Sequence, residues 1–414
     1  MQRWDNPFEA RSRCHRPFLI LVALVMGTSG CGKVPTWDEM TGGNKPAPAQ
    51  MRTVPGSVEV QPGQPAPAVM RPDPAQTVAW FKGLSPQQMT DQGLAQLTSV
   101  ASGLEAITEI NASGSTVTNT GMAEIAKLPA LQKLSLDHTP VTDAGIQLLQ
   151  RVGALQTLTV NSTQITAAGI EHLAALPALK RLELMSCRLS EAEYTAIGKL
   201  PALETLVLNR MTDLTDAGLD LICNASTLKV LYLNDCPGLT DAGMASLAKL
   251  PGLEELYLSR AGISGVGLGA AISKGGLKTL KILVLSYAPI SLPGVRAINN
   301  IKSLERLEFA FIPGFNDAAL VDLVKGMDNL KHLDVESTPL LTGLAFKNMK
   351  ATAASLESLN IQNTNINDQS FGFLISHKRL KSVDVSNTHV TVQGVQQFKR
   401  LIPGCSILHA GVRY

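Results

Sequence analysis

The sequence predicts an α/β fold in which one short strand and one helix recur many times. Between residues 134 and 149 the apolar residues first alternate, at Leu134 and Leu136, and then follow helical spacing, at Ile146 and Leu149. This pattern returns every 24 to 27 residues. One unit cannot bury its apolar face alone, whereas about a dozen stacked units can. We therefore predict a right-handed solenoid with parallel strands.

The repeated unit is clearest in "LQKLSLDHTPVTDAGI", which begins at Leu131. Leu134 and Leu136 face the core, and the residues between them face the other side of the strand. Thr142 is suited to the N-cap of the following helix, and Asp143 complements its dipole. The first residue of each unit is Ile107, Leu131, Leu155, Leu179, Leu203, Leu228, Leu253, Leu280, Leu304, Leu330, Leu356, Leu380 and Cys405.

These units resemble the leucine-rich repeat family, whose pattern is L-x-x-L-x-L-x-x-N/C/T. The "LTDAGL" half is similar to the ribonuclease-inhibitor-like and Cys-containing subtypes, and the resemblance covers roughly residues 80–414. It implies a right-handed leucine-rich-repeat solenoid, a horseshoe with the parallel sheet on its concave face and helices on its convex face. It also implies that one position turns inward and hydrogen-bonds the backbone. The residues that hold this position are Thr139, Thr163, Cys187, Cys236, Thr338, Thr364 and Thr388.

Residues 1–31 have the layout of a secretory signal peptide. A positive region with Arg11, Arg13 and Arg16 precedes the nine-residue apolar run Phe18–Met26, which is shorter than the roughly 20 residues that a membrane-spanning helix needs. The following "TSGC" resembles a bacterial lipobox, in which the cysteine, here Cys31, becomes lipidated. This implies a protein secreted across the inner membrane and lipid-anchored in the envelope, at the outer membrane or the cell surface. A plain signal peptide with an incidental cysteine and a transmembrane anchor are the alternatives.

Composition divides the rest of the chain. Residues 32–77 are rich in Pro, Gly and Ala, so we expect a disordered tether. The stretch "MTDQGLAQL" from Met89 matches the helical half of a unit, so residues 78–106 are expected to form an N-terminal capping unit. Residues 107–404 then hold about 12 repeats, and residues 405–414 form a C-terminal cap.

The composition also argues against several classes of function. The formal net charge is +2, without a basic block, so nucleic acid is not an expected partner. The six cysteines contain no CxxC pair, which argues against a disulfide framework and a zinc site. We read Cys187, Cys223, Cys236 and Cys405 as buried small residues. No catalytic or phosphate-binding motif stands out, so we expect no enzyme activity and no cofactor.

One polar cluster leaves a metal-dependent hydrolase as a remote alternative. In "KHLDVES", His332, Asp334 and Glu336 share one strand face, and Glu308 lies on the neighbouring strand. Such donors hold a metal ion only where they converge. The favoured interpretation is a solvated polar face without a metal.

The candidate binding site lies on the concave face. Val207, Tyr232, Tyr257 and Val284 hold the same outward strand position in four successive units. A contiguous exposed apolar patch marks an interaction site, and Tyr is enriched among binding hot spots. Alternatively, these residues are simply good strand formers that pack across strands. The neighbouring outward position adds Val230, Glu255 and Ile282, and an acidic rim follows at Glu308, Asp334 and Asp384.

The sequence therefore predicts non-enzymatic recognition of a protein partner by the concave face of a membrane-tethered solenoid. A partner with an apolar centre and some basic character would fit. The alternative is a passive envelope scaffold that binds a glycan or wall polymer through Asn161, Asn209 and Asn234.

Overall fold

The computed structural model describes residues 73–100, 102–349 and 352–414. The chain divides into two units, Met1–Ala68 and Val69–Tyr414, and the described residues all belong to the second. The expected signal peptide, Cys31 and most of the expected tether lie outside the described residues. Within the described part of the chain, no helix is long and apolar enough to cross a membrane.

Each repeat contributes one short strand, and the strands join in chain order into a single 14-stranded sheet. Neighbouring strands are parallel, except that β14 is antiparallel to β13. The strands are β1 (Glu109–Asn111), β2 (Lys133–Ser135), β3 (Thr157–Thr159), β4 (Arg181–Glu183), β5 (Thr205–Val207), β6 (Val230–Tyr232), β7 (Glu255–Tyr257), β8 (Ile282–Val284), β9 (Arg306–Glu308), β10 (His332–Asp334), β11 (Ser358–Asn360), β12 (Ser382–Asp384), β13 (Ser406–His409) and β14 (Val412–Arg413).

The segments between strands form helices or single turns. The α-helices are α2 (Pro74–Lys82), α3 (Asp91–Thr98), α4 (Asn119–Ile125), α5 (Asp143–Leu148), α6 (Ala167–Leu173), α7 (Glu191–Gly198), α8 (Asp216–Ile222), α9 (Asp241–Met244), α10 (Val266–Ser273), α11 (Leu292–Asn299), α12 (Asp317–Val324), α13 (Asp368–Gly372) and α14 (Val392–Leu401). Turns of 3-10 helix are η1 (Pro86–Gln88), η2 (Leu104–Ala106), η3 (Leu149–Arg151), η4 (Ala245–Lys249), η5 (Leu344–Asn348), η6 (Thr352–Ala354) and η7 (Phe373–Ser376).

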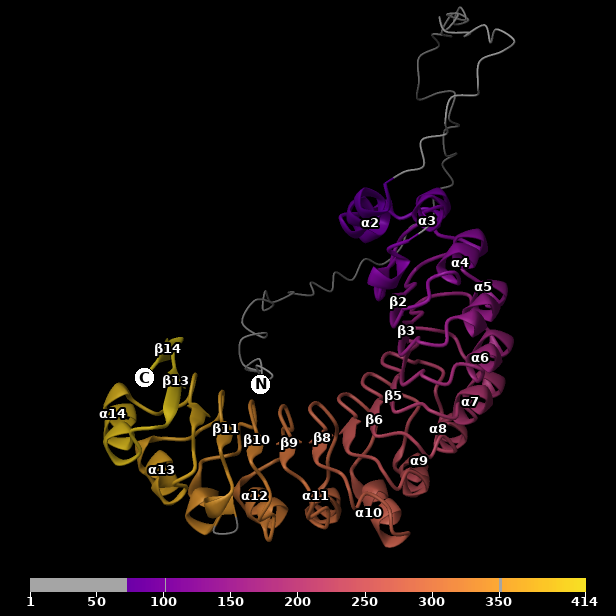
Figure 1. Cartoon of the computed structure of the whole chain (residues 1–414). Coiled ribbons are helices and arrows are strands. Elements are labelled where there is room, and N and C mark those ends of the chain that lie inside the picture. Colours follow the sequence, from indigo (N-terminus) through magenta and orange to yellow (C-terminus); the bar gives the residue numbers. More distant parts are fainter. Residues whose placement is uncertain (1–72, 101, 350–351) are drawn as a thin grey trace, which may run out of the picture. The chain divides into compact units, whose positions relative to one another are not determined.

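The described unit is the right-handed α/β solenoid that the repeats predict. Its strands line the inner, concave side and its helices the outer side (Figure 1). Each repeat meets mainly its neighbours, so the core continues from one repeat to the next.

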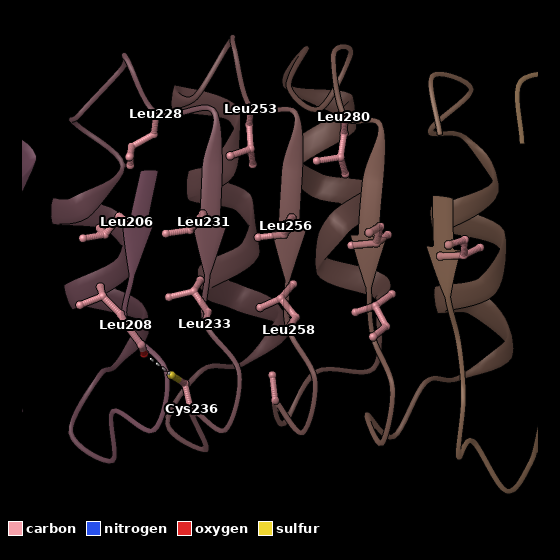
Figure 2. Packing of buried hydrophobic residues seen from close by; sticks show 14 of the residues in the cluster. Leu206, Leu208, Leu228, Leu231, Leu233, Cys236, Leu253, Leu256, Leu258 and Leu280 are labelled. Atoms are coloured by element: carbon pink, nitrogen blue, oxygen red, sulfur yellow. Dashed lines mark hydrogen bonds between the residues drawn. The ribbon is translucent and has the colours of Figure 1, made fainter. Parts of the chain in front are cut away.

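Each unit gives the core two apolar positions in and just after its strand. Leu206, Leu231 and Leu256 take the strand centre, and Figure 2 shows them pointing to the same side of the sheet. Leu208 and Leu233 add the second inward layer, because side chains alternate along a strand. All five are fully buried. The alternation of apolar residues along each strand therefore determines which side chains face the core and which face outward.

The "TDAG" motif links neighbouring repeats. The predicted N-cap Thr142 begins α5, but its hydroxyl accepts a hydrogen bond from Asn119 of the preceding repeat rather than from its own helix. In the same way, Asp216 at the start of α8 accepts hydrogen bonds from the backbone N–H and hydroxyl of Thr240 in the next repeat. Glycine follows three residues after Thr240, at Gly243, where the Asp216 carboxylate takes the space of a side chain. The motif thus stabilises the stacking as well as each helix.

The inward position after the strand behaves as the family resemblance implies. Five threonine hydroxyls there donate to backbone carbonyls at 2.6–2.7 Å, those of Thr139, Thr163, Thr338, Thr364 and Thr388. The Cys236 thiol donates to the carbonyl of Leu208 at 3.2 Å (Figure 2). Cys187 is half-buried rather than buried as predicted, and its sulfur lies 3.7 Å from the carbonyl of Val160, so it sits less deeply. All four described cysteines are free thiols.

The ends of the described unit are covered by short elements. Helix α2 begins at Pro74, with Asp73 accepting at its N-cap, so the helix starts inside the stretch expected to be tether. Val78 and Phe81 of α2 are buried, which explains why these residues fold with the repeats. At the other end, β14 pairs with β13 and covers the last parallel strand.

Candidate functional site

The row of outward residues predicted from the repeat register is present on the concave face. Val207 pairs with Tyr232, Tyr232 with Tyr257, and Tyr257 with Val284 across β5 to β8. On the same face, the column two residues earlier places Val230, Glu255 and Ile282 side by side. All three of these side chains are half-buried.

The two ends of this row are buried rather than exposed as predicted. Val207 is 3% exposed and Val284 is 6% exposed, whereas Tyr232 and Tyr257 are half-buried. The sheet curves toward this face (Figure 1), so side chains on strands about 5 Å apart crowd together and small ones lose their exposure. The surface offered to a partner is therefore the tyrosine pair with Val230 and Ile282.

The two tyrosines form one rigid platform. Their ring centroids are 4.1 Å apart and their planes differ by 8°, a stacked geometry that contributes about 0.5–1.5 kcal/mol beyond burial. The Tyr257 hydroxyl donates to Glu255 Oε2 at 2.8 Å. Burial, and then this hydrogen bond, raise the pKa of Tyr257 well above its usual range. The hydroxyl thus stays protonated, and it fixes Glu255 beside the platform.

A salt bridge within one strand flanks the platform on each side. On β4, Arg181 Nε lies 2.7 Å from Glu183 Oε1, and on β9, Arg306 Nη2 lies 2.6 Å from Glu308 Oε1. The Arg181 guanidinium also lies 5.9 Å from the ring centroid of Tyr232. The sequence analysis did not include either arginine. The repeated "RLE" at residues 181–183 and 306–308 would have indicated both salt bridges, because residues two apart on a strand lie on the same face.

The expected acidic rim is not a row of exposed carboxylates. Glu308 is 7% exposed and is paired with Arg306, and Asp384 is also buried. Asp334 is half-buried and accepts a hydrogen bond from the backbone N–H of Glu336 at 3.0 Å. Burial, with smaller contributions from nearby carboxylates, raises the pKa of Asp334 to about 6. Burial and pairing leave these carboxylates less able to attract a basic partner than the sequence predicts.

The polar groups around His332 do not gather into a metal site. Burial, followed by the charge of Arg306, lowers the pKa of His332. Glu308 is bound by Arg306, and Glu336 accepts a hydrogen bond from Asn360 at 3.2 Å. Among the residues that the structure describes, no group of three or more His, Cys, Asp or Glu side chains could hold a metal ion. The hydrolase alternative therefore has no supporting geometry in this part of the chain.

The asparagines considered for glycan binding join neighbouring repeats. Asn209 Oδ1 accepts from the backbone N–H of Asn234 at 2.9 Å, and Asn234 Oδ1 accepts from that of Ser259 at 2.8 Å. Asn161 is buried and accepts from the N–H of Met185 at 2.6 Å. The three side-chain oxygens accept hydrogen bonds from backbone N–H groups that lie just after the strands. They are therefore already bonded within the protein, which removes the contacts that the glycan alternative proposed.

Comparison with known protein families identifies one of the repeats. Residues 224–248 match the family model described as Leucine Rich repeat. No curated protein matches the chain. The match identifies one leucine-rich repeat, and the units on either side of it stack in the same register of strand and helix.

Two solved structures are similar to the chain at low identity. An internalin (inlF) from Listeria monocytogenes str. 4b F2365 shares 19% identity with a TM-score of 0.48, over 81% of this chain and 93% of the other. TLR13, in a complex with ssRNA13, shares 16% identity with a TM-score of 0.49, over 77% of this chain and 54% of the other. Likeness at this level says nothing about what this chain binds.

Proposed function

We propose that the chain is a non-enzymatic recognition protein that binds a protein partner through the centre of its concave face. The observation that carries the proposal is the Tyr232–Tyr257 platform, held between an Arg–Glu pair on β4 and another on β9. Rigid aromatic side chains with an apolar surround and a polar border are typical of binding hot spots. Because the arginines and Glu255 lie near the platform, the partner presents an apolar group flanked by both donors and acceptors.

We also propose that this solenoid is secreted and held in a bacterial envelope by a lipid on Cys31. The support is the sequence alone: the apolar run Phe18–Met26 followed by "TSGC". A tether at residues 32–77 would let the solenoid reach its partner away from the membrane. We assign the repeats to the ribonuclease-inhibitor-like and Cys-containing subtypes on their helical halves and on Cys236, which holds the inward position.

The test is capture of a partner from envelope extract by the wild-type chain and by Tyr232→Thr/Tyr257→Thr. Threonine holds the same strand position at Thr159, so this variant should fold, which circular dichroism would check. The matched control changes two exposed residues of the convex helices, Gln147→Ser/Glu171→Ser. We expect a protein that the wild type and the control capture and the tyrosine variant loses. Equal capture by all three would place the site elsewhere.

A further inference from the structure

A second feature lies at the edge of the sheet where each strand leads into its helix. Seven residues after the first residue of a unit, the backbone takes a positive φ in repeat after repeat, for example at Ser162, Ser186 and Ser337. Two neighbouring units place aromatic residues there instead, Tyr287 with φ 65° and Phe311 with φ 60°. A bulky side chain in this left-handed region costs about 1–2 kcal/mol. Such strain points to a function.

The strained aromatic residues form an ordered stack with an arginine. The rings of Tyr287 and Phe311 are 4.1 Å apart at 11°, and the Arg260 guanidinium lies 4.7 Å from the centroid of Tyr287. Arg260 also lies 3.3 Å from Asp235. Arg210 holds the same position one unit before Asp235, so charged and aromatic residues occupy this position in five successive repeats. A shallow depression at the cationic end is lined by Arg210, Thr212, Asp235, Pro237 and Arg260.

Apolar side chains continue this edge beyond the stack. The segments from Tyr287 to Leu292, from Phe311 to Asn316 and from Ser337 to Leu344 contain no charged residue. Five large apolar side chains between β7 and η5 are 44–62% exposed, namely Val266, Tyr287, Leu292, Leu340 and Leu344. Tyr287 and Leu340 lie in the loops that follow strands, and Val266, Leu292 and Leu344 are each the first residue of the helix that comes next. Exposed apolar residues grouped in this way mark an interaction surface.

We propose that this edge, from Arg210 to Leu344, is a second docking surface for a protein segment in which Asp or Glu lies close to Leu or Phe. The charge pattern at the positive-φ position selects this occupant: Arg210 and Arg260 outnumber Asp235 there, and the next two units place aromatic residues at the same position. A guanidinium has five N–H donors in a planar fork that suits a carboxylate, and Asp235 and Tyr287 hold that of Arg260 in place. The fixed stack is pre-organised, which favours a defined peptide over a fluid lipid surface.

The test uses an array of synthetic 12-residue peptides with one or two carboxylates within four residues of Leu or Phe. Control peptides replace the carboxylates with amides, or the apolar residues with Ser. The full chain is compared with Tyr287→Ser/Phe311→Ser, because serine already holds this position in other repeats, and circular dichroism confirms folding. We expect the wild type to bind the acidic, apolar peptides above both controls. The serine variant should bind them about tenfold less tightly or worse.

Two further variants separate this surface from the concave face. Arg260→Glu should shift the preference toward peptides with Lys in place of Asp or Glu, whereas Tyr232→Thr/Tyr257→Thr should leave peptide binding unchanged. Equal binding by the wild type and the serine variant, or no peptide above its controls, would overturn the proposal. Flotation of the wild type, but not the serine variant, with phosphatidylglycerol–phosphatidylcholine vesicles would also overturn it, in favour of a lipid.

Discussion

The Asp216 carboxylate occupies the space that a side chain on Gly243 of the next repeat would fill. A Cβ on Gly243 would lie 2.3 Å from Asp216 Oδ1, and the same carboxylate binds the backbone N–H of Thr240 at 2.9 Å. Asp143 stands in the same relation to Gly169, and Asp368 to Gly394. Aspartate in one repeat and glycine in the next are therefore two halves of one contact.

Gly243→Ala should destabilise the chain by about 1–3 kcal/mol, although alanine is the better helix former. The clash with Asp216 outweighs the gain in helix propensity. In an Asp216→Ala background the clash is absent, so Gly243→Ala should become neutral or stabilising. Chemical denaturation of the four proteins in this cycle checks the coupling.

The matched control is Gly372→Ala, because Gly372 lies in α13 and nothing approaches its added Cβ within 4 Å. It should stabilise the chain by about 0.5–1 kcal/mol. If Gly243→Ala lowered the free energy of unfolding equally with and without Asp216, the contact with Asp216 would not be the reason for glycine at position 243.

Asn209→Leu should destabilise the chain by about 1–3 kcal/mol, because it leaves the half-buried backbone N–H of Asn234 without its acceptor. Asn209→Asp keeps an acceptor oxygen and should cost much less. Thermal unfolding of the two variants measures this difference. Equal stability of the wild type and Asn209→Leu would remove the structural role and reopen glycan binding at this position.

Asp334 should make the chain less stable as pH rises from about 4 to 6. Its pKa is about 6 in the folded chain, against an ordinary value of 3.8, so the folded state holds the proton more tightly. The contribution of Asp334 to stability is then greatest below pH 4, falls through this window by about 1–3 kcal/mol, and is constant above it. Asp334→Asn should match the wild type near pH 4 and exceed it at pH 7. Parallel unfolding profiles for the two proteins would refute the assignment.

Cys31→Ser should release the chain from the membrane fraction and abolish incorporation of an alkyne-tagged fatty acid. The covalent lipid is the expected anchor, and Cys14→Ser is the matched control that should change neither readout. Fractionation and click labelling of producing cells give the answer. Unchanged membrane retention and labelling of Cys31→Ser would rule out the lipid on this residue.

The repeat spacing was sufficient to predict the fold, because the alternation of Leu134 and Leu136 repeats with the same register in every unit. It also predicted the row from Val207 to Val284, since equal positions in successive units must become neighbours. Exposure was not predictable in this way. It depends on the curvature of the sheet and on the size of adjacent side chains, which buried Val207, Val284 and Glu308.

Contacts between repeats also could not be predicted from the sequence of one repeat alone. The sequence pattern relates Asp143 to the dipole of its own helix, yet its carboxylate also accepts a hydrogen bond from the backbone N–H of Thr166 in the next repeat at 2.8 Å. The stacking of Tyr287 on Phe311 depends on a positive φ at a position whose residue type varies, since other repeats place His, Ser, Arg, Asp or Asn there. Comparing each position down the column of repeats would have shown both.

The most direct test of the central claim is photo-crosslinking in the cells that produce the protein. A benzophenone amino acid is placed at Tyr257 in one chain and at Glu171 on the convex face in another. The account predicts a discrete protein adduct from position 257 that Tyr232→Thr abolishes, and no such adduct from position 171. An adduct from position 171 alone, or none from position 257 in a folded chain, would contradict recognition by the concave face.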